Sequence, residues 1–467
     1  MKQGFFKKLK SNRLQLLAVI VAALLILDTL TLALIYAFKS KDKVSAPKAD
    51  TEVQKILLGD VEASDVVITQ FYIYGSHLHL EGEVDESLYP GFVRMGLVLR
   101  NSSDKDTEIV LECTREGGKI RFQSSRYINS GICLDELAQG DYCVLFRIVT
   151  DSKKVFVSAK EESDYPAVNY YTVTKNGRNN LVNIGFTRYS TGKKTLNCLA
   201  MRIEEAALPD DVYDVVIDAG HGGADSGAVY KGYRECDFTI EYAKALKKSL
   251  EGLGLKVKMT RNGDEKPDKM TSAASYCKDG RVERANLSGA KYCFCVHFNA
   301  TAGSKTTSAH GLQIYCAYGD DTAFADSMVK SITQSAGIQP SAQEFCRVGT
   351  GVYIRTFGKT EIARSKEIAK KYGYEPYNIP VDRITYYFML RETGGVATGA
   401  YIDGRSAEFN HDENESRNSV TGLETYLLEL GYINNDGDLA LIINNRDAYI
   451  KGLTQAIAKE LGIKTDA

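Results

Sequence analysis

The chain has 467 residues, of which 44% are hydrophobic and 25% are charged, and this composition excludes a wholly disordered protein. Lys and Arg total 58 and Asp and Glu total 60, so the formal net charge of −2 argues against a protein that coats nucleic acid. Ten cysteines are too few for a scaffold built from disulfides, and because Trp is absent, only Tyr and Phe could stack on a sugar ring.

The first patterned segment, residues 14–38, is apolar and contains a single charge, Asp28. As a helix it would be about 38 Å long, which is enough to cross a hydrocarbon core of ~30 Å. It is longer than the apolar part of a signal peptide and shows no convincing cleavage site. We therefore expect a cytoplasmic tail over 1–13, a single transmembrane helix over 14–38 and a linker over 39–60, with the rest of the chain outside the cell membrane.

Residues 61–205 predict an all-β domain. Short runs rich in β-branched and aromatic residues, such as VVITQFYIY and YCVLFRIVT, are separated by polar turns such as NSSDKD and REGGK. Short strands at near-regular spacing are typical of an antiparallel sandwich, of which the immunoglobulin-like fold is one form.

From Val212 onward, strand-like runs alternate with helical spacing. This alternation predicts an α/β domain over 212–465, in which helices flank a twisted, mostly parallel sheet. The expected strands cover 212–218, 255–260, 291–298, 311–317 and 425–433, and the expected helices cover 237–253, 281–290, 321–336 and 446–461.

Three polar side chains at the ends of these elements are candidates for chemistry. His221 lies in the glycine-rich loop DAGHGGADSGAV at the carboxyl end of a strand, where open α/β sheets usually place their sites. His297 ends the strand KYCFCVHF, and Glu235 begins the helix that follows the loop. Taken singly, each has an ordinary explanation: a phosphate-binding loop, a structural histidine, and a carboxylate favoured at a helix N-terminus.

Glu429 is the least ordinary of the candidates. It lies among leucines in an apolar strand, where a carboxylate is costly unless it is paired or bound to a metal. Two histidines and a carboxylate, with a fourth position for water, form a catalytic zinc arrangement, and a separate glutamate supplies the general base. A zinc site that includes Cys293 or Cys295 stays open as an alternative.

Five blocks of sequence resemble the zinc-dependent N-acetylmuramoyl-L-alanine amidases of bacterial cell-wall metabolism, in that family's order. The resemblance implies that His221, Glu235 and His297 bind Zn²⁺ and that Glu429 is the catalytic carboxylate. It also implies that the substrate is peptidoglycan, cut at the amide between N-acetylmuramic acid and L-alanine. The blocks are DAGHGGADSG (218–227), YRECD (233–237), RAN (284–286), VHFNA (296–300) and ELGYIN (429–434).

Two details around this site are also expected. Asp218 or Asn299 is expected to orient the histidines, as outer-shell partners of metal ligands do. Residues 343–421 are longer than a minimal member of the family needs, and they include the run EIARSKEIAKKYG, which reads as a helix. This helix is either a lid over the substrate groove or a plain surface helix.

Other functions remain open from the sequence. One alternative is a non-catalytic cell-wall-binding or scaffold protein that retains the amidase fold, and another is a zinc peptidase that acts on stem peptides. In each case the β-domain is a candidate for contact with a membrane or cell-wall partner, and no nucleic-acid partner is expected.

Overall fold

The computed structural model describes residues 44–463 with some gaps, and the described residues from Ala46 onward form one compact unit. The gaps within this range are residues 104, 161–166, 174–178, 191–194, 264–279, 304, 373–381 and 401–419.

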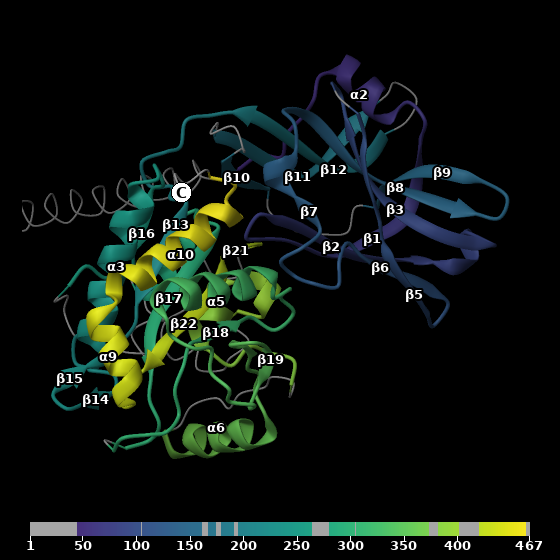
Figure 1. The fold of residues 1–467 in the computed structure, drawn as a ribbon. Coiled ribbons are helices and arrows are strands. Elements are labelled where there is room, and N and C mark those ends of the chain that lie inside the picture. Colours follow the sequence, from purple (N-terminus) through teal and green to yellow (C-terminus); the bar gives the residue numbers. More distant parts are fainter. Residues whose placement is uncertain are drawn as a thin grey trace, which may run out of the picture. The chain divides into compact units, whose positions relative to one another are not determined.

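A mixed seven-stranded sheet forms the centre of the C-terminal part (Figure 1). The first four strands in spatial order are parallel to one another, and the antiparallel pairings occur only where β22 meets β18 and where β20 meets β19. In spatial order the strands are β16 (Val257–Met259), β13 (Val215–Ala219), β17 (Tyr292–Asn299), β22 (Glu424–Tyr432), β18 (Gln313–Cys316), β20 (Val352–Ile354) and β19 (Arg347–Gly349).

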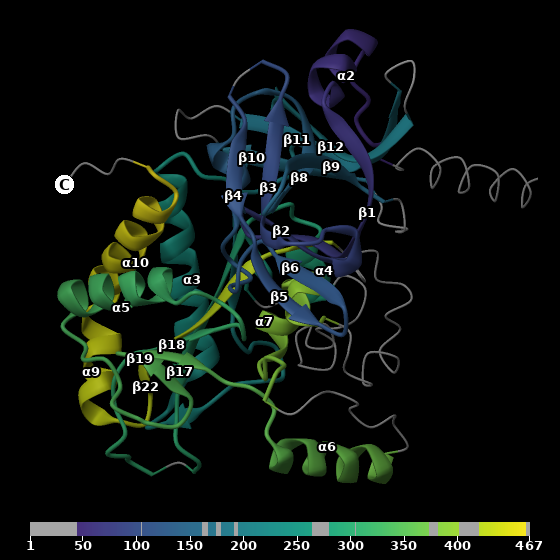
Figure 2. The ribbon, with the colours of Figure 1, turned by 90° about the vertical axis from the view of Figure 1, so that its right-hand side faces the viewer.

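Helices cover both faces of this sheet (Figure 2). Helices α3 (Glu235–Glu251), α5 (Ala323–Ala336) and α10 (Arg446–Glu460) pack on one face. Helices α4 (Arg281–Asn286) and α7 (Phe388–Thr393) pack on the other. This arrangement buries the strands on both sides, as is usual for parallel sheets.

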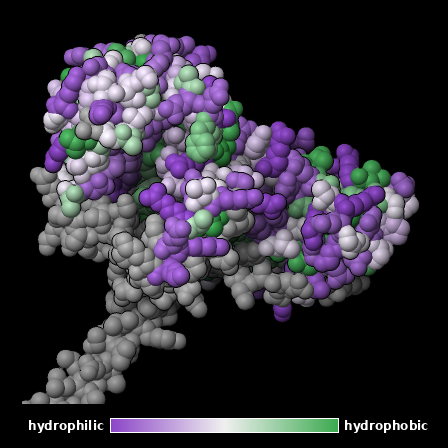
Figure 3. Space-filling view, turned by 90° about the horizontal axis from the view of Figure 1, so that it is seen from below, coloured by the Kyte–Doolittle hydropathy of each residue, from purple (hydrophilic) through white to green (hydrophobic). Residues whose placement is uncertain are grey.

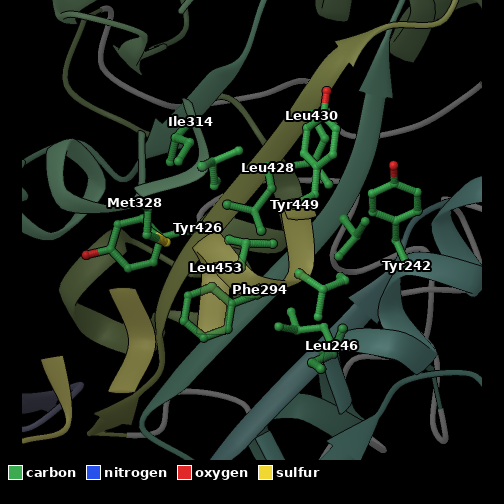
Figure 4. Packing of buried hydrophobic residues seen from close by; sticks show 14 of the residues in the cluster. Tyr242, Leu246, Phe294, Ile314, Met328, Tyr426, Leu428, Leu430, Tyr449 and Leu453 are labelled. Atoms are coloured by element: carbon green, nitrogen blue, oxygen red, sulfur yellow. The ribbon is translucent and has the colours of Figure 1, made fainter. Parts of the chain in front are cut away.

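The larger core lies between the sheet and the α3–α5–α10 face (Figure 4). Phe294 of β17 and Tyr426 and Leu428 of β22 point into it and meet Met328 of α5 and Leu453 of α10. Alternate residues of these strands face the opposite way, because side chains along a strand alternate between its two faces. Cys295, Leu427 and their neighbours therefore form a separate, smaller core under α4 and α7.

The expected strands and helices of this part are confirmed, with ends that differ by a few residues. The helix expected within the long insertion is also present, as α6 (Lys359–Tyr372). Helix α9 (Asp436–Asn444) was not anticipated; Asn435 caps it by accepting hydrogen bonds from the N–H groups of Gly437 and Asp438. A short hairpin, β14 (Val229–Tyr230) and β15 (Tyr233–Arg234), precedes α3.

Residues 61–205 are rich in strands, as their pattern indicates. Strand β1 pairs with β9 through its first half and with β2 through its second half, so it belongs to both halves of a larger sheet that encloses a core of its own. The strands are β1 (Val61–Tyr74), β2 (His77–Asp85), β3 (Phe92–Asn101), β4 (Thr107–Val110), β5 (Glu112–Glu116), β6 (Lys119–Gln123), β7 (Ile132–Cys133), β8 (Gly140–Thr150), β9 (Lys154–Ala159), β10 (Val168–Val173), β11 (Asn179–Ser190) and β12 (Thr195–Glu205).

These strands are joined to the α/β part within the compact unit. The short strand β21 (Thr421–Gly422) pairs in parallel with β1, and Lys291 forms an ion pair of 2.7 Å with Asp135. The division into an all-β domain over 61–205 and an α/β domain over 212–465, like the immunoglobulin-like topology, therefore stays a prediction.

The structure describes only part of the N-terminal region that the sequence divides into a tail, a membrane span and a linker. The expected linker 39–60 contains a helix, α2 (Thr51–Leu58), which begins at Asp50 because that carboxylate accepts a hydrogen bond of 2.9 Å from the N–H of Val53. The tail 1–13 and the span 14–38 lie outside the described residues. Among the described residues, which do not include 14–38, no helix is both long and apolar enough to cross a bilayer, so the described part of the chain does not bear out the expected single-pass membrane location.

Candidate metal centre

Three side chains from three separate elements meet at one edge of the α/β sheet. His221 follows β13, Glu235 is the first residue of α3, and His297 lies near the end of β17. One potential ligand atom from each lies within 4.8 Å of the others. Strands β13 and β17 pair in parallel, so both histidines leave the sheet at the same edge.

The backbone of the glycine-rich loop is shaped for this approach. His221 itself has φ of 58°, in the left-handed region that non-glycine residues rarely adopt. Gly220 lies against the ring of His297, since a Cβ at this position would fall 2.2 Å from the ring atom Cε1. A side chain here would displace the histidine, so the close approach requires glycine.

Glu235 is the centre of the cluster. Its Oε1 atom lies 3.0 Å from Nε2 of His221 and 3.1 Å from Nδ1 of His297. Backbone N–H groups fix the carboxylate, because Phe298 donates to Oε1 and Ala228 donates to Oε2. Only 5% of Glu235 is exposed, so the carboxylate is a buried charge held in one orientation.

The charges of these groups are mutually dependent. Burial raises the pKa of Glu235, but hydrogen bonds from His221 and His297 outweigh it and place the pKa well below its usual value. Burial lowers the pKa of His221, but Glu235 and Asp225 outweigh it and raise the pKa to about 9. The cluster therefore favours a positive charge between the carboxylate and the rings, which is the position a bound cation would take.

Asp225 orients His221 and was missed by the sequence reasoning. Its Oδ2 lies 2.9 Å from Nδ1 of His221, which leaves Nε2 to face the cluster. Its other oxygen accepts a hydrogen bond of 3.0 Å from the N–H of Gly227. The available signal was its place four residues after His221 in the same glycine-rich loop.

The expectation that Asp218 or Asn299 orients the histidines is wrong. Asp218 is buried and accepts hydrogen bonds from Thr260 at 2.5 Å and from Arg281 at 2.7 Å. Arg281 in turn donates to the backbone carbonyl of His221, so Asp218 supports the loop and not the ring. Asn299 donates to the side chain of Gln313.

Glu429 lies directly opposite His297 on the neighbouring strand β22. Its Oε2 atom is buried and has no hydrogen-bond partner in the described part of the chain. Burial, with a further contribution from the charge of Glu235, raises the pKa of Glu429 to about 8, although His221 opposes the shift. A buried oxygen without a partner is costly, so this atom is suited to meet a substrate or a water molecule.

The donor set fits a zinc ion of the catalytic type. Two imidazole nitrogens and one carboxylate oxygen converge, and catalytic zinc sites combine three such protein ligands with a water molecule. The sulfur atoms of Cys293 and Cys295 are 4.0 Å from each other and buried, but the group of convergent ligands among the described residues includes neither. The cysteine-containing alternative is therefore not favoured by the geometry.

Residues 215–362 match the family model of N-acetylmuramoyl-L-alanine amidases. The matched segment contains His221, Glu235 and His297, whereas Glu429 lies beyond the matched range. The chain is 37% identical over 92 residues to an endolysin of Bacillus phage SPP1, covering 20% of this chain and 31% of the relative. It is 33% identical over 122 residues to the probable cell wall amidase LytH of Staphylococcus aureus, covering 25% and 36%. The chain thus spans about a third of the length of these curated relatives.

Solved amidase structures are more distantly similar. The catalytic domain of the amidase CwlV from Bacillus (Paenibacillus) polymyxa is 20% identical, with a TM-score of 0.34, over 54% of this chain and all of that one. The amidase AmiC2 of Nostoc punctiforme is 19% identical, with the same TM-score, over 54% of this chain and 99% of that one. TM-scores this low do not by themselves establish a common fold.

Proposed function

We propose that the chain is a zinc-dependent amidase that hydrolyses the bond between N-acetylmuramic acid and L-alanine in peptidoglycan. The observation that carries the proposal is the convergence of His221, Glu235 and His297 beside the unpartnered carboxylate of Glu429. The family match over residues 215–362 supports the choice of bond and substrate.

In the proposed reaction, the metal and Glu429 have separate roles. When bound by His221, Glu235 and His297, zinc supplies a Lewis acid that activates water and polarises the scissile carbonyl. Glu429 accepts the proton of the attacking water through its free oxygen and then donates it to the leaving amine of L-alanine. The raised pKa of Glu429 suits a group that takes up a proton and then releases it.

The test is mass spectrometry of purified peptidoglycan after digestion by the full chain. Samples are compared as isolated, after chelation, and after zinc is added back. We expect free stem peptides with N-terminal L-alanine and intact glycan, released only when metal is present.

Each alternative function gives a different product. Cleavage within the stem would indicate a zinc peptidase, and binding of peptidoglycan without any released product would indicate a scaffold. Either result would overturn the proposed amidase, as would full activity after complete removal of the metal.

A further inference from the structure

An open groove lies between the start of α3, the helix that begins at the candidate ligand Glu235, and the junction of α9 with α10. Its volume is about 440 Å³. Figure 1 shows the β14–β15 hairpin, which leads into α3, next to α9. In the view from below, apolar side chains of the described residues occur in small groups among hydrophilic ones (Figure 3). The groove is thus a defined feature on a surface of mixed polarity.

An aromatic platform forms one wall of the groove. Tyr233 is 43% exposed, and its ring stacks on that of Phe238 with 5.7 Å between centroids and 24° between planes. Phe238 packs in turn on Phe298, with a centroid distance of 5.7 Å. The face of Tyr233 is therefore presented to solvent on a rigid support.

Polar side chains, together with the exposed Ile443, line much of the rest of the groove. Glu241, Asn444 and Arg446 are exposed, and Asn445 is half-buried. Carboxylate, amide and guanidinium groups around an exposed aromatic face match the two-sided chemistry of a pyranose ring, which has C–H groups on its faces and hydroxyls on its rim.

The two walls are held together without a ligand. The hydroxyl of Tyr242 in α3 donates a hydrogen bond of 2.7 Å to the carbonyl of Ile442 in α9. Lys231 in the hairpin forms an ion pair of 2.6 Å with Asp436 at the start of α9. A groove that is already formed binds a ligand with little ordering cost.

Two residues that form or support the platform are close in sequence to the candidate metal ligands. Tyr233 precedes the candidate ligand Glu235 by two residues, so their Cα atoms are at most about 7 Å apart. Phe298, which supports the platform, directly follows the candidate ligand His297. A polymer engaged at the metal centre would therefore reach this groove.

We propose that the groove binds a sugar ring of the substrate's glycan strand, stacked on Tyr233 beside the metal centre. This inference rests on the proposed function for its choice of occupant. The absence of Trp from the chain fits the use of a tyrosine for this stacking. Tyr233 then acts in substrate binding, and the stem peptide extends from the metal centre in another direction.

The first experiment measures binding without requiring catalysis. The probe is tetra-N-acetylchitotetraose, a β-1,4-linked N-acetylhexosamine chain without peptides, and saturation-transfer NMR is recorded on the full chain with the metal removed. We expect binding by the wild type and roughly fivefold to tenfold weaker binding by Tyr233→Ala, because one stacked ring is lost. The matched control is Tyr318→Ala, since Tyr318 is 44% exposed but lies outside the groove, and it should bind like the wild type.

The second experiment separates binding from chemistry in the zinc-loaded enzyme. We expect Tyr233→Ala to raise KM for polymeric peptidoglycan fragments much more than KM for a single-sugar muramyl peptide, with a similar kcat for the polymer. Failure of the wild type to bind the probe, or equal binding by Tyr233→Ala, would overturn the sugar site. An equal rise in KM for both substrates would also overturn it. Because the first experiment needs no turnover, its outcome is distinct from failure of the proposed amidase activity.

Discussion

Glu235 and Glu429 are two glutamates whose surroundings shift their pKa values in opposite directions. Hydrogen bonds from two histidines and two backbone N–H groups stabilise the charged form of Glu235. Among the residues that the structure describes, none is a hydrogen-bond partner for Oε2 of Glu429, and burial raises the pKa of this carboxyl to about 8. Pairs of titratable groups whose pKa values are shifted apart are typical of sites in which one group binds a ligand and the other acts as acid or base.

The role of Glu429 is testable with a substitution of nearly equal shape. Glu429→Gln should reduce turnover of peptidoglycan by about 10²-fold or more, because the amide cannot carry the proton. Zinc content, measured by elemental analysis, should be unchanged, since the three candidate ligands are intact. The control is Glu251→Gln, an exposed residue at the far end of α3. Full turnover by Glu429→Gln would remove Glu429 from the mechanism.

Asp225 should matter for metal affinity. Asp225→Ala removes the partner of His221 Nδ1, and loss of such an orienting group typically weakens metal binding by about 10–100-fold. Competition with a chromophoric chelator measures the affinity. Asp326→Ala, which removes an exposed carboxylate from α5, should leave it unchanged. An unaltered affinity in Asp225→Ala would contradict the assigned role.

At the scale of elements, the glycine-rich loop lets the end of β13 and the start of α3 approach each other closely. Gly227 has φ of 63°, and a Cβ there would lie 2.7 Å from Oε2 of Glu235 and 2.7 Å from Cδ2 of His221. The loop must therefore provide both an unusual backbone conformation and space for two candidate ligands. Only glycine meets both requirements without strain.

This dual requirement gives a prediction with a matched control. Gly227→Ala should lose most zinc affinity, because the new methyl group displaces Glu235 and His221. Gly254→Ala has a similar φ of 86° but no atom within 4 Å of the new Cβ, so it should lose only about 1 kcal/mol of stability. Thermal unfolding and zinc titration of both variants provide the comparison. Equal zinc affinity in the two variants would contradict the predicted displacement of Glu235 and His221.

At the scale of the whole molecule, Glu424 connects the strand-rich part to the α/β sheet. It lies at the start of β22, is buried, and accepts hydrogen bonds from Asn129 at 2.9 Å and from the hydroxyl of Tyr426. Burial raises the pKa of Glu424 to about 7, although the two donors oppose the shift. Burial also raises the pKa of Asp320, and the nearby charge of Glu424 adds to this shift.

The raised pKa of Glu424 predicts how the stability of the fold depends on pH. The folded state holds the proton of Glu424 up to about pH 7, whereas the unfolded chain releases it near pH 4.5. The stabilising contribution of protonated Glu424 to the free energy of unfolding is therefore full below pH 4.5 and is lost as the pH rises through 7. Glu424→Gln cannot ionise, so its free energy of unfolding in urea should fall less between pH 5 and pH 8 than that of the wild type. The same fall in both proteins would contradict this assignment.

Much of the α/β part could be predicted from local sequence. The strands around Val215 and His297 and the helix that begins at Glu235 follow from apolar periodicity, which depends only on neighbouring residues. The helix α9 was missed because its cap, Asn435, lies only three residues after the end of β22 at Tyr432. The switch of β1 between two halves of a sheet depends on which strands pair with it, and that information is not local.

The sequence by itself determined the choice of four candidate site residues, the resemblance to the amidase family and most elements of the α/β part, because short motifs and periodicity carry this information. Only the tertiary structure decided that Asp225, and not Asp218, orients His221, that an oxygen of Glu429 lacks a partner, and that Tyr233 lines a groove beside the candidate ligands. The physical reason is that hydrogen bonds and burial depend on strand register and on the packing of elements far apart in the chain.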